Sequence, residues 1–305
     1  MRILLTGATG AIGSRLAPRL VAEGHEVRGL SRDPGAAMPH GVERFAGDAV
    51  TGAGLDRALH GVDVAYFLIH SMEQGAGDRF PALEHAAADN FGLAARVAGV
   101  RRIVYLGGLI PADAEASLHL SSRLAVERAL LGATPEAVAF RASIVIGSAS
   151  RSFRFLVRLI ERMPVLVLPA WRTHVTTPID ERDITEYLLR AATIPPAARL
   201  SIDIGGPERV TYQGLIERIR DLMLLSRPVL AIPQLTATPI ASRVSAAIAG
   251  EQHELIGPLM EGLDSDLLPR DESAPGTFGL TRHSLDAAIE HALAEWESSE
   301  PLRAR

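Results

Sequence analysis

The sequence predicts an α/β protein of Rossmann type, with a doubly wound parallel sheet and a smaller C-terminal substrate lobe. Three observations predict this fold class. Short apolar runs alternate with helical patterns over the first half of the chain, which is typical of βαβ units. A glycine-rich turn follows the first apolar run and begins a helix, as in folds that bind dinucleotides. The 305 residues suit one large α/β domain with a small lobe.

Hydrophobic periodicity places the elements of the first half in a regular order. The nearly unbroken apolar run Ile103–Leu106 indicates a strand that is buried on both faces. Strands are expected at Arg2–Leu5, Glu26–Leu30, Glu43–Ala46, Val62–Leu68, Arg102–Leu106 and Ala137–Ala142. Helices are expected at Ile12–Glu23, Leu55–Leu59, Asp78–Ala98 and Leu118–Leu131.

The second half is less regular, and prolines interrupt it. Thr211 is the expected N-cap of one helix, and Pro269–Gly276 is an expected surface loop. We assign residues 148–178 and 227–276 to the substrate lobe, and residues 179–226 to segments that return to the core. Strands are expected at Val165–Leu168 and Leu200–Ile204, and helices at Phe153–Arg162, Ile184–Ala192, Tyr212–Leu224 and Ser284–Trp296.

Composition excludes several classes of chemistry. The net charge of −5 is mild for this length and gives no reason to expect nucleic acid or an anionic membrane as a partner. Without cysteine there is no disulfide or thiolate chemistry, and without lysine there is no Schiff base and no lysine-assisted tyrosine. We see neither a signal peptide nor a membrane span, and we expect a soluble, cytoplasmic protein without a metal. A homo-oligomer is possible.

The segment Thr6–Gly13, with the sequence TGATGAIG, has the features of a phosphate-binding loop. Gly7 permits the tight turn, Gly10 lets the backbone approach a diphosphate, and Gly13 lets the helix pack closely on the strand. The phosphates would then face the positive end of the helix dipole. The strand before the loop and the amphipathic helix after it give the context that the motif requires. Residues 1–147 are therefore the expected NAD(P)-binding core.

The end of the second strand favours NADP(H) over NAD(H). An NAD site usually places an acid there for the ribose 2′-hydroxyl, whereas this chain has Ser31 followed by Arg32. A guanidinium pairs well with a 2′-phosphate. Asp33 is the alternative, because it could serve as the acid of an NAD site.

The spacing of this loop resembles the short-chain dehydrogenase/reductase superfamily in its extended and atypical branches, and the NmrA-like NAD(P)-binding proteins in particular. The resemblance covers roughly the first 220 residues. It implies that Asp48 contacts the adenine and that His70 and Ser71 lie beside the ribose, or else that these are ordinary polar loop residues. The expected cofactor residues are Thr6, Gly7, Thr9, Gly10, Ala11, Ile12, Gly13, Ser31, Arg32, Asp48, Leu68, His70, Ser71, Gly107 and Arg123.

The usual catalytic residues of the family are replaced. Aligned on Ser122–Glu127, the family's lysine position is Arg123, its tyrosine position is His119 and its serine position falls in Gly107–Gly108. In one interpretation His119 and Arg123, four apart on one helix face, do analogous work, with the histidine as the acid. In a second interpretation the proton relay is lost and the chain only binds the nucleotide. In a third, His119 is a capping or core-edge residue.

Four other polar features have a structural interpretation. Tyr105 could be a substitute acid, but core packing is favoured for it and for Tyr66, because both lie within apolar strands. Asn90 could form a local backbone or water link, or be an ordinary helix residue. In Thr177–Ile184, which resembles the family's helix-entry segment, the acids are expected to cap a helix.

The lobe is rich in apolar residues and has arginines at positions 151, 154, 158 and 172. It is either an apolar cleft with a few basic groups or a lobe core with solvated arginines. We therefore expect an enzyme, an NADP(H)-dependent oxidoreductase of a small, largely apolar carbonyl or enone. The alternatives are a non-catalytic NAD(P)-binding regulatory or assembly protein, and a non-redox isomerase or cyclase on the same fold.

Overall fold

The computed structural model describes residues 1–69, 80–111, 118–195, 199–231 and 262–300. A parallel sheet of seven strands in the order β11-β6-β5-β4-β1-β2-β3 forms the core, which confirms the Rossmann-type fold class. The order in which strands are added reverses between β1 and β4, because β2 and β3 extend the sheet on one side of β1 and the later strands extend it on the other. Open α/β sheets bind their ligands at such a switch point. The strands are β1 (Arg2–Thr6), β2 (Glu26–Ser31), β3 (Val42–Ala46), β4 (Val64–Phe67), β5 (Arg102–Gly108), β6 (Glu136–Ala142) and β11 (Arg199–Ile204).

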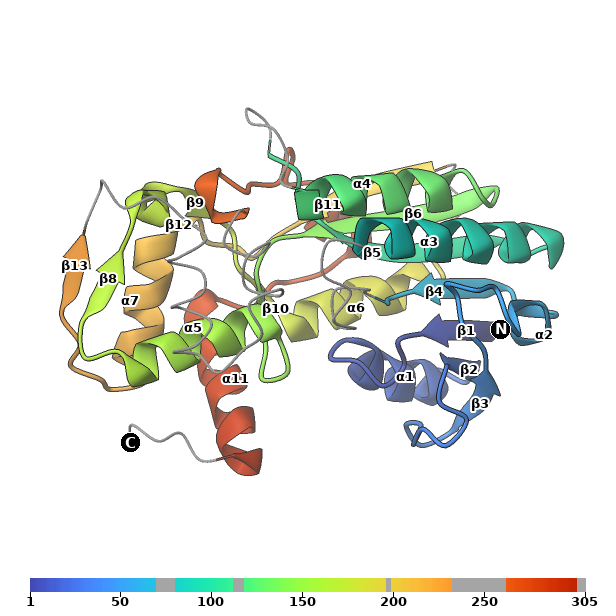
Figure 1. Ribbon diagram of the computed structural model, residues 1–305, viewed down its shortest axis with the longest axis horizontal. Helices are drawn as coiled ribbons and strands as arrows, with labels where there is room; N and C mark the ends of the chain where they lie inside the picture. The colour runs from blue at the N-terminus through green and yellow to red at the C-terminus, as the bar shows by residue number, and fades with distance from the viewer. Residues whose placement is uncertain (70–79, 112–117, 196–198, 232–261, 301–305) are drawn as a thin grey trace.

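Helices cover both faces of this sheet (Figure 1). One face carries α1 (Gly13–Ala22) and α6 (Glu181–Ala191), and the other carries α2 (Leu55–Leu59), α3 (Phe80–Val97) and α4 (Leu118–Leu131). Successive strand residues alternate between the two cores, as the pleat requires. In β1, Ile3 and Leu5 pack with α1 and α6, whereas Leu4 packs with α2 and α3.

The lobe has an apolar core of its own. It is built from α5 (Arg151–Arg162), η3 (Ala170–Thr173), α7 (Tyr212–Leu222) and α11 (Leu285–Ser299), whose buried residues form one cluster. Thus α6 and β11 return to the sheet, whereas α7 packs in the lobe. The small elements are β7 (Val145–Ile146), β8 (Leu166–Leu168), β9 (Val175–Thr176), β10 (Ile179–Asp180), β12 (Val210–Thr211), β13 (Val229–Ala231), η4 (Gly262–Asp264) and α10 (Ala274–Phe278).

Most expected elements are present, with small shifts of their ends. Thr211 is confirmed as an N-cap, since its hydroxyl accepts from the amide of Gly214 at 3.0 Å. The prediction of a surface loop over Pro269–Gly276 is wrong for its last residues, because α10 begins at Ala274. Proline is well tolerated in a first helical turn, and Gly279 ends this short helix with a positive φ of 59°.

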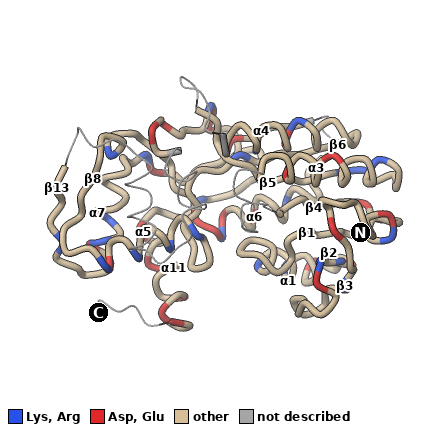
Figure 2. The backbone as a smooth tube through the Cα atoms, viewed as in Figure 1, with Lys and Arg blue, Asp and Glu red and all other residues tan. Residues whose placement is uncertain are grey.

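Charged residues of both signs are interspersed over the described chain (Figure 2). Among the residues that the structure describes, no helix has the length and hydropathy that a bilayer crossing requires.

Candidate functional site

Two glycines of the phosphate loop occupy positions where a side chain would collide with backbone. Gly7 has a φ of +69°, and a Cβ there would lie 2.7 Å from the carbonyl oxygen of Leu68. A Cβ on Gly13 would lie 2.0 Å from the carbonyl oxygen of Gly7. The first turn of α1 therefore packs directly on the loop, which is the close approach that a dinucleotide cradle needs.

Among the residues that the structure describes, no side chain caps the N-terminus of α1. Its N-cap residue, Ile12, makes no side-chain capping bond, and the first turn contains no acidic residue. Thr9 and Gly10, which precede it, are exposed. Because amides at the start of a helix carry partial positive charge, this end of α1 suits a diphosphate.

Thr6 holds the ends of two central strands together. Its buried hydroxyl donates to the carbonyl of Tyr66 at 3.0 Å and accepts from the amide of Leu68 at 2.9 Å. Both hydrogen bonds join the end of β1 to the end of β4, at the switch point of the sheet. The Thr6 side chain therefore fixes the geometry of the loop that follows it.

A cleft of about 600 Å³ joins the carboxyl ends of the strands to the lobe. His70 and Ser71 lie outside the described residues, so their roles stay predictions. The other expected cofactor residues all line the cleft, namely Thr6, Gly7, Thr9, Gly10, Ala11, Ile12, Gly13, Ser31, Arg32, Asp48, Leu68, Gly107 and Arg123.

The residues at the end of β2 and just after it have different contacts. Ser31 and Arg32 line the cleft, and Asp33 does not. Oδ1 of Asp33 instead accepts from the amide of Gly35 at 2.7 Å, and the Ser31 hydroxyl accepts from the amide of Asp33 at 3.2 Å. The Asp33 carboxylate thus stabilises the turn, and the charged residue that lines the cleft directly after β2 is Arg32.

Asn90 supports the loop that carries Asp48. From α3 its side-chain amide donates to the carbonyls of Ala49 and Val50 at 3.3 and 2.7 Å. Oδ1 of Asp48 accepts from the amide of Val50 at 2.9 Å. Asn90 therefore makes the backbone link that was one of its two expected roles.

Arg123 presents a fixed positive charge to the cleft from α4. Its buried guanidinium donates to the carbonyl of Leu106 and lies 5.0 Å from the centre of the Tyr105 ring. Arginine does not release its proton in proteins, so this group can bind hydroxyls but cannot shuttle a proton. His119 falls in the first turn of α4, and its side chain lies outside what the structure describes.

Two tyrosines near the cleft are confirmed as core residues. The hydroxyl of Tyr105 donates to the carbonyl of Arg123 at 3.2 Å, and that of Tyr66 donates to the carbonyl of Leu188 at 2.8 Å. Both side chains are buried, and burial raises the pKa of both phenols. Neither tyrosine is therefore poised to give up a proton near neutral pH.

The cleft wall contains an acid that sequence reasoning missed. Asp180 caps α6 as expected, accepting from the amide of Arg182 at 2.7 Å. Its neighbour Glu181 was expected to do similar work, but it lines the cleft and is only 1% exposed. A Cβ on Gly147 would lie 2.0 Å from a carboxylate oxygen of Glu181, so the carboxylate fills the space that this glycine leaves.

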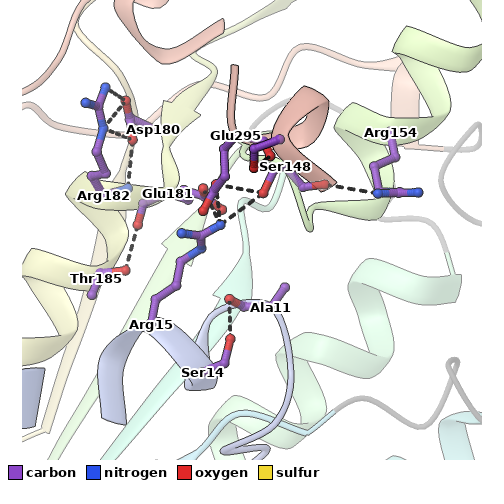
Figure 3. Close-up of polar contacts among 11 residues, drawn as sticks. Ala11, Ser14, Arg15, Ser148, Arg154, Asp180, Glu181, Arg182, Thr185 and Glu295 are labelled. Carbon is purple, nitrogen blue, oxygen red and sulfur yellow. Dashed lines mark hydrogen bonds and ion pairs between the residues drawn. The ribbon is translucent and has the colours of Figure 1, made fainter. Parts of the chain in front are cut away.

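Arg15 of α1 joins Glu181 to two other elements (Figure 3). Its Nη2 lies 3.0 Å from Glu181, 2.5 Å from Glu295 of α11 and 3.0 Å from the hydroxyl of Ser148. No spacing motif connects residues 15, 148, 181 and 295 in the sequence, so this cluster follows only from the fold.

The two carboxylates of this cluster differ in pKa. Burial raises the pKa of Glu181 to about 7, against the opposing charge of Arg15. The hydrogen bond from Arg15 lowers the pKa of Glu295 to about 2. Ligand atoms of Glu181, His291 and Glu295 lie within 4.8 Å of one another, but the Arg15 guanidinium already provides the cation here, so the geometry gives no support to a metal.

The lobe half of the cleft is mostly apolar. Of the four lobe arginines that were considered, only Arg151 lines it. Arg154 and Arg158 lie 4.3 and 4.8 Å from the centre of the Trp296 ring and pair with Glu300. Arg172 donates to the side chain of Gln213 at 2.9 Å. Three of these cations are thus engaged within the lobe and are not basic groups of a ligand pocket.

Comparison with known proteins agrees with this geometry. Residues 7–137 match the sequence model of a family described as NAD(P)H-binding. A ceramide reductase of Caulobacter vibrioides is 25% identical over 288 residues, which cover 91% of this chain and 90% of that protein. A (4-alkanoyl-5-oxo-2,5-dihydrofuran-3-yl)methyl phosphate reductase of Streptomyces griseus is 35% identical over 123 residues, 40% of this chain and 39% of that one.

Other relatives are longer or share the fold alone. The chain spans about a quarter of the length of uncharacterised proteins of Mycobacterium tuberculosis and Mycobacterium bovis that it matches at 25% identity. The solved structure of the Bordetella bronchiseptica enzyme WbmH in complex with NAD⁺ has a TM-score of 0.71 at 15% identity. It covers 98% of this chain and 99% of that one.

The sheet order and the phosphate loop define a Rossmann-fold protein that binds a nicotinamide dinucleotide. Within that class, residues 7–137 match an NAD(P)H-binding family, and the chain resembles the atypical short-chain dehydrogenase/reductases of the NmrA-like, NAD(P)-binding kind.

Proposed function

We propose that this protein is an NADP(H)-dependent oxidoreductase that reduces a small, largely apolar carbonyl or enone. The observation that carries the proposal is a continuous cleft that both the phosphate loop and apolar lobe residues line. A cofactor and an apolar substrate could therefore meet inside it, away from bulk water. The two reductases among the relatives support this reaction class.

The residues that would hold the cofactor follow from the cleft. The start of α1 would bind the diphosphate, Arg32 and Ser31 the 2′-phosphate, and Asp48 the adenine. Arg123 would hold the nicotinamide ribose. The bound cofactor supplies the hydride that reduces the substrate, and the chain must supply a proton to the substrate oxygen. His119 is our candidate for that proton donor, because imidazolium is a competent acid near neutral pH.

The substitution His119→Phe tests the proton donor. With a carbonyl substrate that supports steady NADPH oxidation, we expect kcat to fall by roughly 10²-fold, the usual contribution of one acid–base group. His85→Phe is the matched control, since His85 is an exposed residue of α3 and should leave the rate unchanged. Unchanged turnover in His119→Phe would remove this residue from the mechanism.

The substitution Arg32→Ala tests the cofactor. Loss of a charge-assisted pair with the 2′-phosphate should raise the Kd for NADPH by about 10- to 100-fold and leave the Kd for NADH nearly unchanged. Calorimetric titration of both nucleotides measures the two constants. Arg57→Ala, an exposed arginine on α2, should change neither. Equal affinity of the unmodified protein for NADPH and NADH would contradict the NADP assignment.

A second candidate is a non-catalytic NAD(P)-binding regulatory or assembly protein. The observation that favours it is the fixed charge of Arg123 in the family's lysine position, beside a Tyr105 hydroxyl that is already bonded to backbone. This candidate predicts tight nucleotide binding without turnover of any carbonyl. An isomerase or cyclase would instead convert its substrate with no net change in the cofactor.

A further inference from the structure

The lobe wall of the cleft contains a buried donor with no acceptor. Trp171 of η3 lines the cleft and is only 5% exposed. Its indole N–H meets no hydrogen-bond partner among the residues that the structure describes. Buried polar groups in folded proteins almost always have a partner, so an exception needs an explanation. A ligand that supplies an acceptor would be one.

The surroundings of Trp171 set the chemistry of such a ligand. Phe155, Leu156, Leu215 and Ile216 line the same part of the cleft and belong to the same apolar cluster as Trp171. These side chains offer dispersion contacts and no hydrogen bonds. Most of a ligand seated here must therefore be hydrocarbon.

The acceptor must also be uncharged. Tyr212, whose ring stands edge-on to that of Trp171 at 6.1 Å between centroids, is buried, and burial raises the pKa of its phenol. The arginines Arg154, Arg158 and Arg172 are engaged elsewhere in the lobe. Arg151 is the one of the four lobe arginines that lines the cleft, and it is exposed to solvent, so its charge is largely screened. An anion seated against the buried Trp171 would thus lose its hydration without gaining a buried counter-charge from these four arginines, which is strongly unfavourable.

We infer that the Trp171 indole N–H is a specificity-determining donor, which binds an uncharged oxygen acceptor on an otherwise apolar ligand. This rests on the proposed function in one respect, that the ligand is the substrate. The substrate class is then narrowed to apolar carbonyl compounds that present a neutral acceptor, such as a carbonyl, ester or amide oxygen, to the lobe. Binding itself does not depend on turnover.

Two probes that differ in the acceptor alone test the inference. These are 2-octanone and 2-methyl-1-octene, in which a methylene group replaces the ketone oxygen. Ligand-observed NMR with the full chain gives both Kd values. In Trp171→Phe we expect the affinity for the ketone to fall by about tenfold more than the affinity for the alkene, the usual value of one neutral hydrogen bond. Equal losses would overturn the inference, because only shape would then matter.

A second measurement needs no variant and keeps the test valid if Trp171→Phe does not fold. The chain has two tryptophans, and therefore two indole N–H resonances in a ¹⁵N-labelled sample. The ketone should shift the Trp171 resonance downfield, while the alkene should not. The buried Trp296 serves as the internal reference. Identical spectra with the two probes would overturn the inference.

The outcomes separate this inference from the proposed function. If the acceptor effect appears but no carbonyl compound is reduced, the site at Trp171 stands and the reductase proposal fails. If a carbonyl compound is reduced but both probes respond alike, the reductase proposal stands and the role of Trp171 fails.

Discussion

At the scale of single residues, the phosphate loop allows a sharp test at Gly13. A Cβ there would lie 2.0 Å from the Gly7 carbonyl oxygen, so Gly13→Ala must push α1 away from the loop. We expect the Kd for NADPH to rise at least tenfold and the free energy of unfolding to fall by about 1–3 kcal/mol. Calorimetry and urea denaturation measure the two effects.

The control for this substitution is Gly276→Ala. No atom lies within 4 Å of a Cβ added there, and its φ is not positive. Gly276 also lies inside α10, where alanine is the better helix former. Stability should therefore be unchanged or slightly higher. Normal nucleotide binding by Gly13→Ala would show that the loop is not the cradle we describe.

Single residues were predictable where local chemistry decides their role. The roles of Gly7 and Gly13 in the turn follow from sterics, and the burial of Tyr66 and Tyr105 follows from their place in apolar strands. Glu181 was not predictable. An acidic residue directly after an N-cap is normally interpreted as part of the cap. The Glu181 carboxylate instead pairs with Arg15, which is far away in the sequence.

At the scale of elements, the Arg15 cluster ties α1 to α6 and α11, and it should make stability depend on pH. The pKa of Glu181 is raised from 4.5 to about 7 by burial, so the folded state holds its proton more tightly than the unfolded chain. The contribution of Glu181 to the free energy of unfolding is therefore complete below pH 4.5 and is lost as the pH rises toward 7.

Glu181→Gln should remove this pH dependence. We expect the stability of the variant, relative to the original protein, to rise by about 1–3 kcal/mol between pH 5 and pH 8, as measured by urea denaturation. Glu186→Gln on the same helix is the control. Arg190 and Arg19 lower the pKa of Glu186 against its partial burial, so its effect should be nearly the same at both pH values. Parallel curves for Glu181→Gln would refute the shifted titration.

Helices were largely predictable, and the two-residue strands were not. The helix Leu118–Leu131 has the predicted ends, because several turns of apolar periodicity define it. The five-residue helix Leu55–Leu59 also has the predicted ends. The strands β7, β9, β10 and β12 have two residues each, too few to show any periodicity. Such strands form only because neighbouring segments hold their backbones together, as β7 and β10 do in parallel register.

At the scale of the whole molecule, nucleotide binding should stabilise the fold against heat. NADPH at 100 times its Kd adds about 2.7 kcal/mol to the free energy of unfolding, which is roughly 5 °C in Tm for a chain of this size. A thermal scan with and without NADPH measures the shift. Gly13→Ala should show little of it, and the absence of any shift in the original protein would contradict nucleotide binding.

The sheet was predictable at this scale, but the lobe was not. Alternating strands and helices permit few topologies, because βαβ crossovers are nearly always right-handed. The lobe follows no such rule. Its core assembles α5, α7 and α11 from three separate stretches of the chain, and α7 lies in a segment that the sequence assigned to the Rossmann core. Only the tertiary contacts show that it packs in the lobe.

The two tryptophans are intrinsic fluorescence probes in different surroundings. Trp296 is fully buried and lies against the guanidinium groups of Arg154 and Arg158, whereas Trp171 lines the cleft. Because the emission of an indole responds to what touches it, a molecule that enters the lobe perturbs one emitter directly and leaves the other as a steady background. Filling of the lobe could therefore be followed in unlabelled protein, in real time and without chemical turnover.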